Sequence, residues 1–393
     1  MKTLAKSLFA ISAAVIALAA CQKDSTTTPG SEIGPLNLPE SPYDYSSLNL
    51  PTHLSTNALL GPGQNAAADN DNMPASNPIT NEGATLGRVL FYDKKLSANG
   101  TVACASCHKQ DKAFGDDLVL SDGFDGGKTR RHSMTLVNAR FYDRGRFFWD
   151  ERAATLEEQV LMPFQDEVEM GMTLEQIVAT VKAQSYYPSL FQDAFGNAEI
   201  NSDRIAKALA QFVRSISSVN SRYDEGRKLV DNPGQDFPNF STSENNGKRL
   251  FLLPPPQGGG GCIGCHSTKA FINPDNGPTN NGLDAASTTD LGVYEAIKNP
   301  VFIGSFKVPS LKSIALSAPY MHDGRFATLE EVIEHYNSGI QAHPNLGGAL
   351  KDQNGNPIRL NWTAQQKTDV VNFLKTLTDE TISTDVRFSS PFR

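Results

Sequence analysis

The chain has 393 residues, of which 39% are hydrophobic and 20% charged, and its formal net charge is −8 at pH 7. The length allows about two modest domains of a globular protein. The acidic balance and the lack of a basic stripe argue against a nucleic-acid partner, because such a partner requires lysine and arginine to replace the counterions of its phosphates. A neutral or basic protein partner stays open.

The N-terminus has the features of an export signal. Residues 1–20 carry two lysines ahead of an apolar run that is too short to span a membrane as a mature helix. The letters "LAAC" at 18–21 resemble a bacterial lipobox, which implies cleavage before Cys21 and lipidation of that cysteine. An ordinary signal peptide with an incidental cysteine is the alternative. Residues 21–80 are rich in small and polar residues and lack periodicity, so we expect a flexible tether on a lipid-anchored periplasmic protein.

The four cysteines other than Cys21 lie in two short motifs, "CASCH" at 104–108 and "CIGCH" at 262–266. None is left for a structural disulfide. Zinc would need four ligands from closely spaced pairs, and a thioredoxin-like site would need no histidine after each pair. Covalent haem c uses every residue of both motifs, because two thioethers hold the porphyrin and the next histidine binds the iron. We therefore predict thioethers at Cys104, Cys107, Cys262 and Cys265, with His108 as iron ligand of haem 1 and His266 as iron ligand of haem 2.

The rest of the chain predicts a mainly α fold. "TLEEQVLM" at 155–162 and "TLEEVIEHY" at 328–336 each begin with a threonine followed three residues later by glutamate, as at a capped helix start. Residues 363–377 predict an amphipathic helix with Val370, Phe373, Leu374 and Leu377 on one face. No series of alternating strands is found. We expect two cytochrome-c-like domains, over 81–240 and 241–393, each with one covalent haem c.

Several segments together resemble one family, the bacterial di-haem cytochrome c peroxidases and their MauG-like relatives. They run from "LGRVLFYDKKLSANGTVACASCH" through "NARFYDRGRFFWDERAATLEEQVLMPFQDEVEMG" and "CIGCH" to "FKVPSLKSIALSAPYMHDGRFATLEEVIEHY". The resemblance implies an N-terminal domain whose haem 1 reacts with peroxide and a C-terminal domain whose haem 2 receives electrons. It also implies that Trp149 relays electrons between the two haems. A core aromatic residue is the alternative for Trp149.

The same resemblance places Gln159, Pro163 and Glu169 around the peroxide pocket. A carboxylate beside an open haem position has a chemical use, since cleavage of the O–O bond requires a proton to move from the near to the far oxygen. Glu169 is the candidate acid/base, Gln159 a hydrogen-bonding helper and Pro163 a block on the distal face. The alternative for Glu169, in the acidic run "DEVEMG", is a solvated surface charge.

The sixth ligand of haem 1 is expected to be absent or water. Family members that need reductive activation carry a removable histidine about 16 residues after the first motif, where this chain has Phe124. His132 lies farther along and matches that position poorly, so we expect a structural loop residue there.

For haem 2 the family supplies methionine or, in MauG-like members, tyrosine from the helix after "MHDG". Tyr336 shares a helical face with apolar residues, and His335 lies on another face. Tyr336 stands where the peroxidases carry methionine, so we predict it as the haem 2 ligand. As a phenolate it would favour ferric and higher-valent iron. A core tyrosine with Met321 on the iron is the alternative, and His322 is expected near haem 2 without binding it.

The family further implies a calcium ion between the domains, bound by backbone carbonyls near Lys307 and Pro309. His132 stands where the family's asparagine ligand is expected, so the sequence leaves calcium open.

Three functions follow from these expectations. The first is a peroxidase that reduces hydrogen peroxide to water with electrons from a small redox protein, such as a monohaem cytochrome c or a cupredoxin. The second is MauG-like oxidation of aromatic residues in a protein, favoured by Tyr336 and by the missing loop histidine. The third is a plain di-haem electron-transfer cytochrome, in which Gln159 and Glu169 have no role. The sequence leaves a homodimer open.

Overall fold

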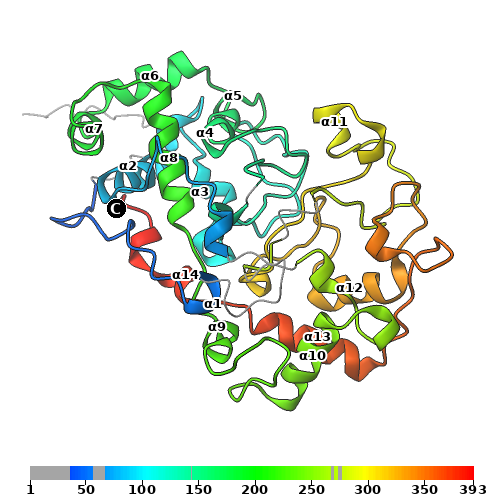
Figure 1. Cartoon of the computed structure of the whole chain (residues 1–393). Coiled ribbons are helices and arrows are strands. Elements are labelled where there is room, and N and C mark those ends of the chain that lie inside the picture. The colour runs from blue at the N-terminus through cyan, green and yellow to red at the C-terminus, as the bar shows by residue number, and fades with distance from the viewer. Residues whose placement is uncertain (1–35, 56–66, 143, 267–269, 273–276) are drawn as a thin grey trace, which may run out of the picture.

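The computed structural model describes residues 36–55, 67–142, 144–266, 270–272 and 277–393. Within these ranges the chain forms helices, turns and isolated β-bridges but no β-strand. Figure 1 shows two groups of helices, one around α2 and α8 and the other around α10 and α13. The predicted mainly α fold is confirmed. None of the helices in the described ranges is long and apolar enough to cross a membrane.

The α-helices are short and joined by long irregular segments with 3₁₀ turns. They are α1 (Thr52–Ser55), α2 (Asn81–Tyr92), α3 (Cys104–Cys107), α4 (Leu156–Gln159), α5 (Met162–Gln165), α6 (Leu174–Ala183), α7 (Tyr187–Phe195), α8 (Ser202–Ser215), α9 (Arg222–Arg227), α10 (Thr242–Leu252), α11 (Tyr294–Ile297), α12 (Leu329–Glu334), α13 (Ala364–Lys375) and α14 (Glu380–Thr384). A π-helical turn, His335–Gly339, continues α12. Threonines cap both predicted helix starts: Thr155 accepts from the backbone of Glu158, and Thr328 from that of Glu331.

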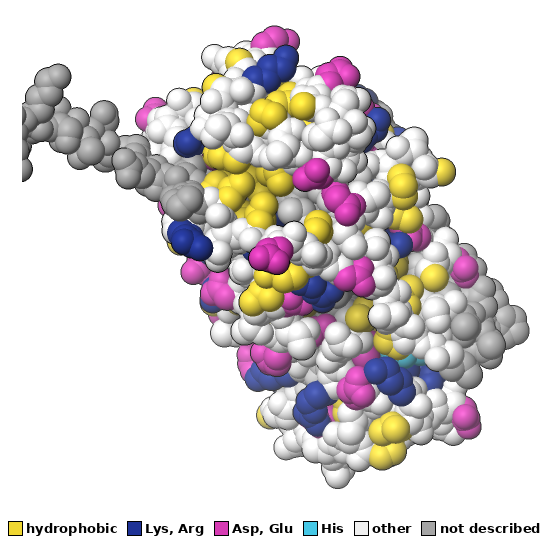
Figure 2. All heavy atoms as spheres, turned by 90° about the vertical axis from the view of Figure 1, so that its left-hand side faces the viewer, with side chains coloured by type: hydrophobic (Ala, Val, Ile, Leu, Met, Phe, Trp, Pro, Cys, Tyr) yellow, Lys and Arg dark blue, Asp and Glu magenta, His cyan; other side chains and the backbone are white. Residues whose placement is uncertain are grey.

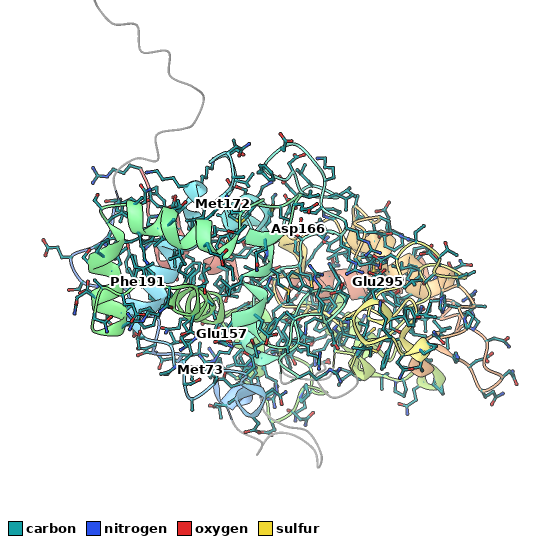
Figure 3. All side chains as sticks on the ribbon, turned by 90° about the horizontal axis from the view of Figure 1, so that it is seen from above. Met73, Glu157, Asp166, Met172, Phe191 and Glu295 are labelled. Carbon is teal, nitrogen blue, oxygen red and sulfur yellow. The ribbon has the colours of Figure 1, made fainter. Side chains whose placement is uncertain are left out.

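The first hydrophobic core forms where α2 crosses α8. Gly87 permits this close approach, because a Cβ atom at that position would lie 2.0 Å from the carbonyl oxygen of Ala208. The rings of Phe91 and Phe212 meet at the crossing with centroids 5.2 Å apart. Phe191 of α7, labelled in Figure 3, is fully buried in the same core.

The second core repeats this packing with α10 and α13. A Cβ atom on Gly247 would lie 1.9 Å from the carbonyl oxygen of Asp369. The rings of Phe251 and Phe373 again have centroids 5.2 Å apart. The apolar face predicted for the last long helix is buried as expected at all four positions, Val370, Phe373, Leu374 and Leu377. Each domain is thus built on one helix pair that a glycine allows to cross closely.

The two cores do not divide at residue 240. Tyr223, Phe237 and Phe240 belong to the second core, although the sequence placed them in the first domain. The C-terminal segment returns to the first domain, where Ile382 and Phe388 join the first core. Both side chains are apolar and are buried in that core. The predicted boundaries at 240 and 393 are corrected accordingly.

The N-terminal segment also packs on both domains, so the predicted flexible tether does not extend over residues 36–55. Tyr45 and Leu54 are buried in the first core, and the Tyr45 hydroxyl donates to the carbonyl of Arg387 at 2.6 Å. His53 Nε2 lies 3.0 Å from the Asp224 carboxylate of α9. Residues 36–55 pack in this way because scattered apolar side chains are buried, although the segment shows no helical or strand periodicity in its sequence. Cys21 lies outside the described residues.

Residues 67–80 are likewise held by specific contacts. Asn77 donates to the Glu157 carboxylate at 2.8 Å, and that carboxylate also binds Arg214 of α8 at 2.6 Å. Figure 3 shows Glu157 and Met73 on the same side of the first domain.

On the face of the molecule drawn in Figure 2, hydrophobic side chains form a patch among interspersed basic and acidic ones.

Charged side chains join the two domains. Arg131 lies 2.6 Å from Asp150 of the first domain and 2.7 Å from Asp290 of the second. Its neighbour Arg130 lies 2.5 Å from Glu295, which Figure 3 labels on the far side of the domain junction. Because the Arg131 guanidinium is only 8% exposed, this ion pair is screened less by solvent than a surface pair. The junction therefore ties the two domains together through a mostly buried arginine.

Candidate functional site

The first motif forms a single helical turn, α3, with His108 directly after it. The His108 ring nitrogen Nδ1 lies 2.8 Å from the carbonyl oxygen of Phe114. An imidazole held this way through Nδ1 presents Nε2 to a metal. Burial lowers the pKa of His108, which keeps the ring in the neutral form that binds iron.

The second motif has the same arrangement. Cys262–Gly264 form a 3₁₀ turn, and His266 Nδ1 lies 3.2 Å from the carbonyl oxygen of Phe271. Burial lowers the pKa of His266 to about 4. All four motif cysteines are unpaired with one another. This donor set, two thiols and one neutral imidazole in each motif, fits covalent haem c.

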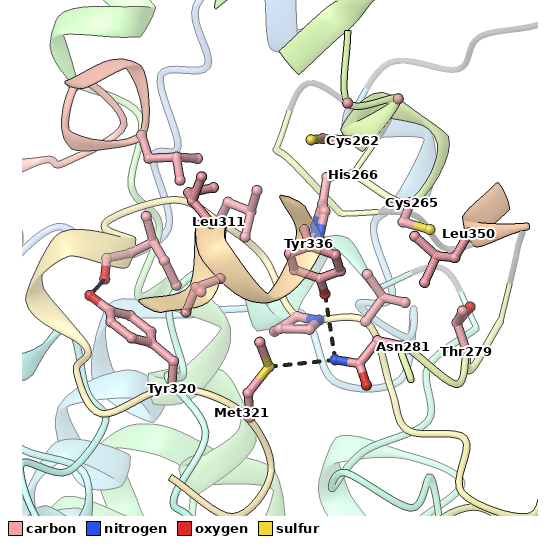
Figure 4. A pocket seen from close by; sticks show the side chains of 18 of the residues that line it. Cys262, Cys265, His266, Thr279, Asn281, Leu311, Tyr320, Met321, Tyr336 and Leu350 are labelled. Carbon is pink, nitrogen blue, oxygen red and sulfur yellow. Dashed lines mark hydrogen bonds between the residues drawn. The ribbon is translucent and has the colours of Figure 1, made fainter. Parts of the chain in front are cut away.

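A large cavity opens beside the second motif. Figure 4 shows the Cys262, Cys265 and His266 side chains in its wall, with Tyr336 and Met321 facing inward. Most of the remaining wall is apolar and comes from the second domain: Leu311, Ile314, Ile333, Leu350, Leu360, Val370 and Leu374. Such a lining suits a flat, largely apolar porphyrin.

The glycine-rich stretch 258–261 packs against this cavity. A Cβ atom on Gly260 would lie 2.8 Å from the Trp362 ring and 3.0 Å from the sulfur of Cys262. The Trp362 indole N–H donates to the carbonyl of Gly258 at 3.1 Å. The absence of a side chain at Gly260 therefore lets the tryptophan close on the second motif.

Glu169 lies by the first motif. Its pKa is raised to about 7, chiefly by burial and also by the nearby charge of Asp166, while the charge of Arg152 acts in the opposite direction. Burial raises the pKa values of the Cys104 and Cys107 thiols to about 12 and about 11, and the Glu169 charge adds to both shifts. Among the described residues its carboxylate has no hydrogen-bond partner. Glu169 is thus a half-buried acid poised near neutral pH, and the surface-charge alternative is disfavoured.

The loop after the first motif packs against the segment that carries Glu169. The backbone N–H of Phe124 donates to the Glu169 carbonyl at 3.1 Å, and the Phe124 ring lies against Gly171. Gly123 is pressed onto the backbone of Val168, where a Cβ atom would lie 1.8 Å from the carbonyl oxygen. Phe124, which stands at the position of the family's removable histidine, therefore packs beside Glu169.

Gln159 and Pro163 are both half-buried, at the end of α4 and in the first turn of α5. Among the described residues no hydrogen bond joins either of them to Glu169 or to the first motif. Their place in a peroxide pocket stays a prediction.

Arg152 is a residue that the sequence reasoning missed. Its guanidinium lies 3.5 Å from the centroid of the Phe148 ring and donates to Asp150 at 3.0 Å. Asp150 is itself fixed by Arg131 at the domain junction. Since the Arg152 charge acts on Glu169, the junction and the acid are electrostatically connected. The arginine follows directly on "FFWDE", a signal that the sequence contained.

Trp149 joins the two domains. Its indole N–H donates to the carbonyl of His132, and its own carbonyl accepts from the backbone N–H of Lys307, both at 2.8 Å. Its ring lines the second-motif cavity and meets the His322 ring edge-on, with centroids 6.5 Å apart. His322 is stacked on Phe306 with centroids 3.7 Å apart and also lines this cavity, as expected for a residue near haem 2.

His132 is held by the loop around it. Its Nδ1 lies 3.0 Å from the carbonyl oxygen of Leu118 and 3.3 Å from that of Val119. The residue is 5% exposed, and burial lowers its pKa. These contacts hold the His132 ring to the loop through Nδ1, and its structural role stays a prediction.

Tyr336 and Met321 both reach the second-motif cavity. The amide nitrogen Nδ2 of Asn281 lies 3.5 Å from the Tyr336 hydroxyl and 3.5 Å from the Met321 sulfur. Burial raises the pKa of Tyr336 to about 12, and the Asn281 hydrogen bond lowers it. His335 instead turns to the carbonyl of Asn281 at 3.0 Å. Both neighbours thus contact Asn281, Tyr336 at its side-chain amide and His335 at its backbone carbonyl, and their ring centroids lie 5.1 Å apart.

Calcium between the domains, bound by backbone carbonyls near Lys307 and Pro309, stays a prediction. Calcium takes about six to eight oxygen ligands. The carbonyl of Pro309 faces the His266 ring, and the Lys307 ammonium donates to the carbonyl of Arg146 at 2.7 Å above the Tyr142 ring. The described residues also contain no cluster of three or more acidic, histidine or cysteine side chains suited to a metal ion. No step is derived from calcium.

Comparisons with known proteins agree with this geometry. A family model described as di-haem cytochrome c peroxidase matches residues 81–229. The methylamine utilization protein MauG of Methylorubrum extorquens is 33% identical over 308 residues, which cover 78% of this chain and 81% of that protein. The cytochrome c551 peroxidase of Nitrosomonas europaea is 31% identical, over 83% of this chain and 90% of its own.

Among solved structures, a MauG-like protein associated with microbial copper homeostasis superimposes with a TM-score of 0.71 at 33% identity. The match covers 82% of this chain and 96% of that protein. The di-haem peroxidase BthA of Burkholderia thailandensis, at 22% identity and a TM-score of 0.60, shares the fold.

Proposed function

Because the chain belongs to the family of di-haem cytochrome c peroxidases and MauG proteins, we propose that it reduces hydrogen peroxide to water with two electrons from a small redox protein. The family implies haem c as the cofactor. A monohaem cytochrome c or a cupredoxin is the donor class we propose, with electrons entering at haem 2 and passing through Trp149 to haem 1.

Each of the two motifs has its own residues for holding one haem. Bound haem iron supplies the redox centre at which peroxide is reduced. Cys104 and Cys107 anchor haem 1 and His108 binds its iron, and the residues of the second motif do the same for haem 2. The carbonyls of Phe114 and Phe271 orient the two imidazoles, which supports these assignments.

The position of Glu169 is the observation that carries the proposal. A carboxylate with a pKa of about 7 beside the first motif is close to the ideal acid/base at neutral pH. Ionised Glu169 takes the proton from the near oxygen of peroxide and returns it to the far oxygen, which leaves as water. Gln159 is proposed to hold the peroxide by a hydrogen bond, and Pro163 to keep the distal face closed to larger ligands.

The residue at the position of the family's removable histidine supports an open haem 1. That residue is Phe124, whose ring has no atom that can bind iron and packs against Gly171. We therefore propose that haem 1 is ready for peroxide in its resting ferric state.

MauG-like oxidation of aromatic residues in a protein is the second candidate, and Tyr336 favours it. The tyrosine reaches the cavity where we propose that it binds haem 2 iron, and MauG proteins are among the chain's relatives. A plain electron-transfer cytochrome gives no role to a half-buried acid beside the first motif.

We further propose that the protein is periplasmic and held at a membrane by a lipid on Cys21. Metabolic labelling with a tritiated fatty acid tests this, since label must be lost in a Cys21→Ser variant. A homodimer is a further proposal, and gel filtration of the lipid-free protein tests it.

Steady-state turnover tests the peroxidase proposal. With hydrogen peroxide and a reduced monohaem cytochrome c, two cytochromes should be oxidised for each peroxide consumed. Peroxide consumption without cytochrome oxidation would favour the MauG-like reaction, and the absence of both would favour electron transfer alone.

A further inference from the structure

Two side chains that can bind haem iron share the cavity at the second motif. Figure 4 shows the Tyr336 hydroxyl and the Met321 sulfur on either side of the Asn281 amide. Both lie 3.5 Å from the same nitrogen, Nδ2. The two groups come from different segments, a π-helical turn and the loop before α12, so their convergence depends on the tertiary fold.

Neither group is tied firmly in place. A separation of 3.5 Å is at the long end of hydrogen bonding, and a thioether is a weak acceptor. No other hydrogen bond of the Tyr336 hydroxyl or the Met321 sulfur is found in the described part of the chain. Either group can therefore exchange its contact with Asn281 for a bond to iron.

The backbone at Met321 supports a functional placement. Its φ angle of 75° lies in the left-handed region, which residues with side chains seldom adopt. The neighbours hold it there: the Tyr320 N–H donates to the Phe326 carbonyl at 2.7 Å, and the Gly324 N–H donates to the Met321 carbonyl at 3.3 Å. The loop thus keeps the thioether turned toward the cavity at a conformational cost.

The two groups prefer different oxidation states of iron. A phenolate is an anionic oxygen ligand that suits ferric haem, whereas a thioether is a soft neutral ligand that suits ferrous haem and raises the reduction potential. We propose that haem 2 exchanges its sixth ligand on reduction, with Tyr336 on the ferric iron and Met321 on the ferrous iron. This inference rests on the proposed binding of haem at the second motif.

The exchange balances in atoms and charge. A one-electron donor of the redox-protein class reduces the iron, the bond from iron to the Tyr336 oxygen breaks, and the phenolate takes up one proton from water. The Met321 sulfur then binds the iron with no proton change. Water can reach this place through a polar cavity of about 470 Å³ that shares Asn281, Phe306 and His322 with the haem cavity. Reoxidation reverses each step.

Two conservative variants test the exchange by spectroscopy, without peroxide. In Tyr336→Phe, the ferric spectrum of haem 2 should change and the ferrous spectrum should stay as in the wild type. In Met321→Leu, the ferric spectrum should stay and the ferrous haem 2 should become five-coordinate. Each variant is its own folding control, because one oxidation state is expected to be unaffected. Met73→Leu, whose sulfur accepts from the Ile79 N–H in the first domain, is the matched control and should change neither spectrum.

Carbon monoxide gives a second readout. In the dithionite-reduced wild type it should bind rapidly at haem 1 alone, and in Met321→Leu at both haems. An unchanged ferrous spectrum in Met321→Leu would show that Met321 does not bind the ferrous iron, and an unchanged ferric spectrum in Tyr336→Phe would show that Tyr336 does not bind the ferric iron. Either result overturns the exchange. Since no peroxide is used, these outcomes are independent of whether the peroxidase proposal holds.

Discussion

The indole N–H of Trp149 donates to the carbonyl of His132 at 2.8 Å. The backbone N–H of His132 in turn donates to the carbonyl of His322 at 2.8 Å, so one short chain of hydrogen bonds crosses from the first domain to the second. The proposed electron route runs through this tryptophan, which lines the second-motif cavity. His132 contributes its backbone to this connection, while its ring secures the loop.

Replacement of Trp149 by phenylalanine should slow electron transfer between the haems. We expect turnover with reduced cytochrome c to fall by at least about tenfold, or 1.4 kcal/mol in activation free energy, because the indole relay is lost. The optical spectra of both haems should stay unchanged. Tyr294→Phe on α11 is the control and should keep wild-type turnover. Equal turnover in Trp149→Phe and the control would remove Trp149 from the electron route.

Replacement of Glu169 by glutamine should impair the reaction with peroxide. An acid/base contributes about 10²-fold or more, so the rate constant for peroxide should fall by that factor. In the wild type the rate should rise with pH through about 7, since the ionised fraction of Glu169 grows there. Stopped-flow measurements across pH 5.5 to 8.5 would check both. Glu167→Gln, an exposed neighbour in the same segment, is the matched control. A profile that stays flat in the wild type would exclude Glu169 as the base.

Replacement of Arg152 by glutamine should move that pH profile to higher pH. The Arg152 charge lowers the pKa of Glu169, so its loss leaves burial and the Asp166 charge to raise that pKa unopposed. The maximum rate at high pH should stay near the wild-type value, which separates this effect from misfolding. Arg144→Gln is the control. A midpoint that is equal in both variants would mean that Arg152 does not act on Glu169.

Replacement of Asp224 by asparagine should destabilise the fold. Lys312, His53 and Ser221 all contact this fully buried carboxylate, and the change leaves the Lys312 ammonium without a counterion. Losing one partner of a buried pair costs about 3–5 kcal/mol. Denaturant unfolding would measure the loss, with Asp203→Asn on the surface of α8 expected to stay within about 0.5 kcal/mol of the wild type. An equal free energy of unfolding in both variants would refute this.

The same carboxylate should make stability depend on pH in the acid range. Burial raises the pKa of Asp224, but the Lys312 charge and the hydrogen bonds from His53 and Lys312 outweigh it and hold the pKa well below its usual range. The stabilisation is therefore complete above the unfolded pKa of about 3.9 and is lost as pH falls through the folded pKa. In Asp224→Asn this component of acid unfolding should be missing.

Local patterns predicted the parts of the fold that depend on neighbours in sequence. Thr328 caps its helix and the apolar face around Phe373 is buried, because these features are set within a few residues. The family resemblance added the assignment of haem 1 to the first motif and haem 2 to the second.

The remainder depends on contacts between distant segments, which no local period encodes. No local period indicated that the segment around Tyr45 packs on the first core, or that Phe388 returns to it from the C-terminal end. Asn281 was missed because only the tertiary fold brings Met321 and Tyr336 beside its amide. Arg152 was missed because its effect on Glu169 depends on segments that are 17 residues apart.

The most direct measurement is sequential-mixing stopped flow on the ferric protein, with hydrogen peroxide first and a reduced monohaem cytochrome c second. The proposed function predicts a rapid change in the haem 1 spectrum, followed by oxidation of two cytochromes per peroxide and return to the starting spectrum. A ferric spectrum that ignores peroxide, or an oxidised spectrum that persists while the cytochrome stays reduced, would contradict it.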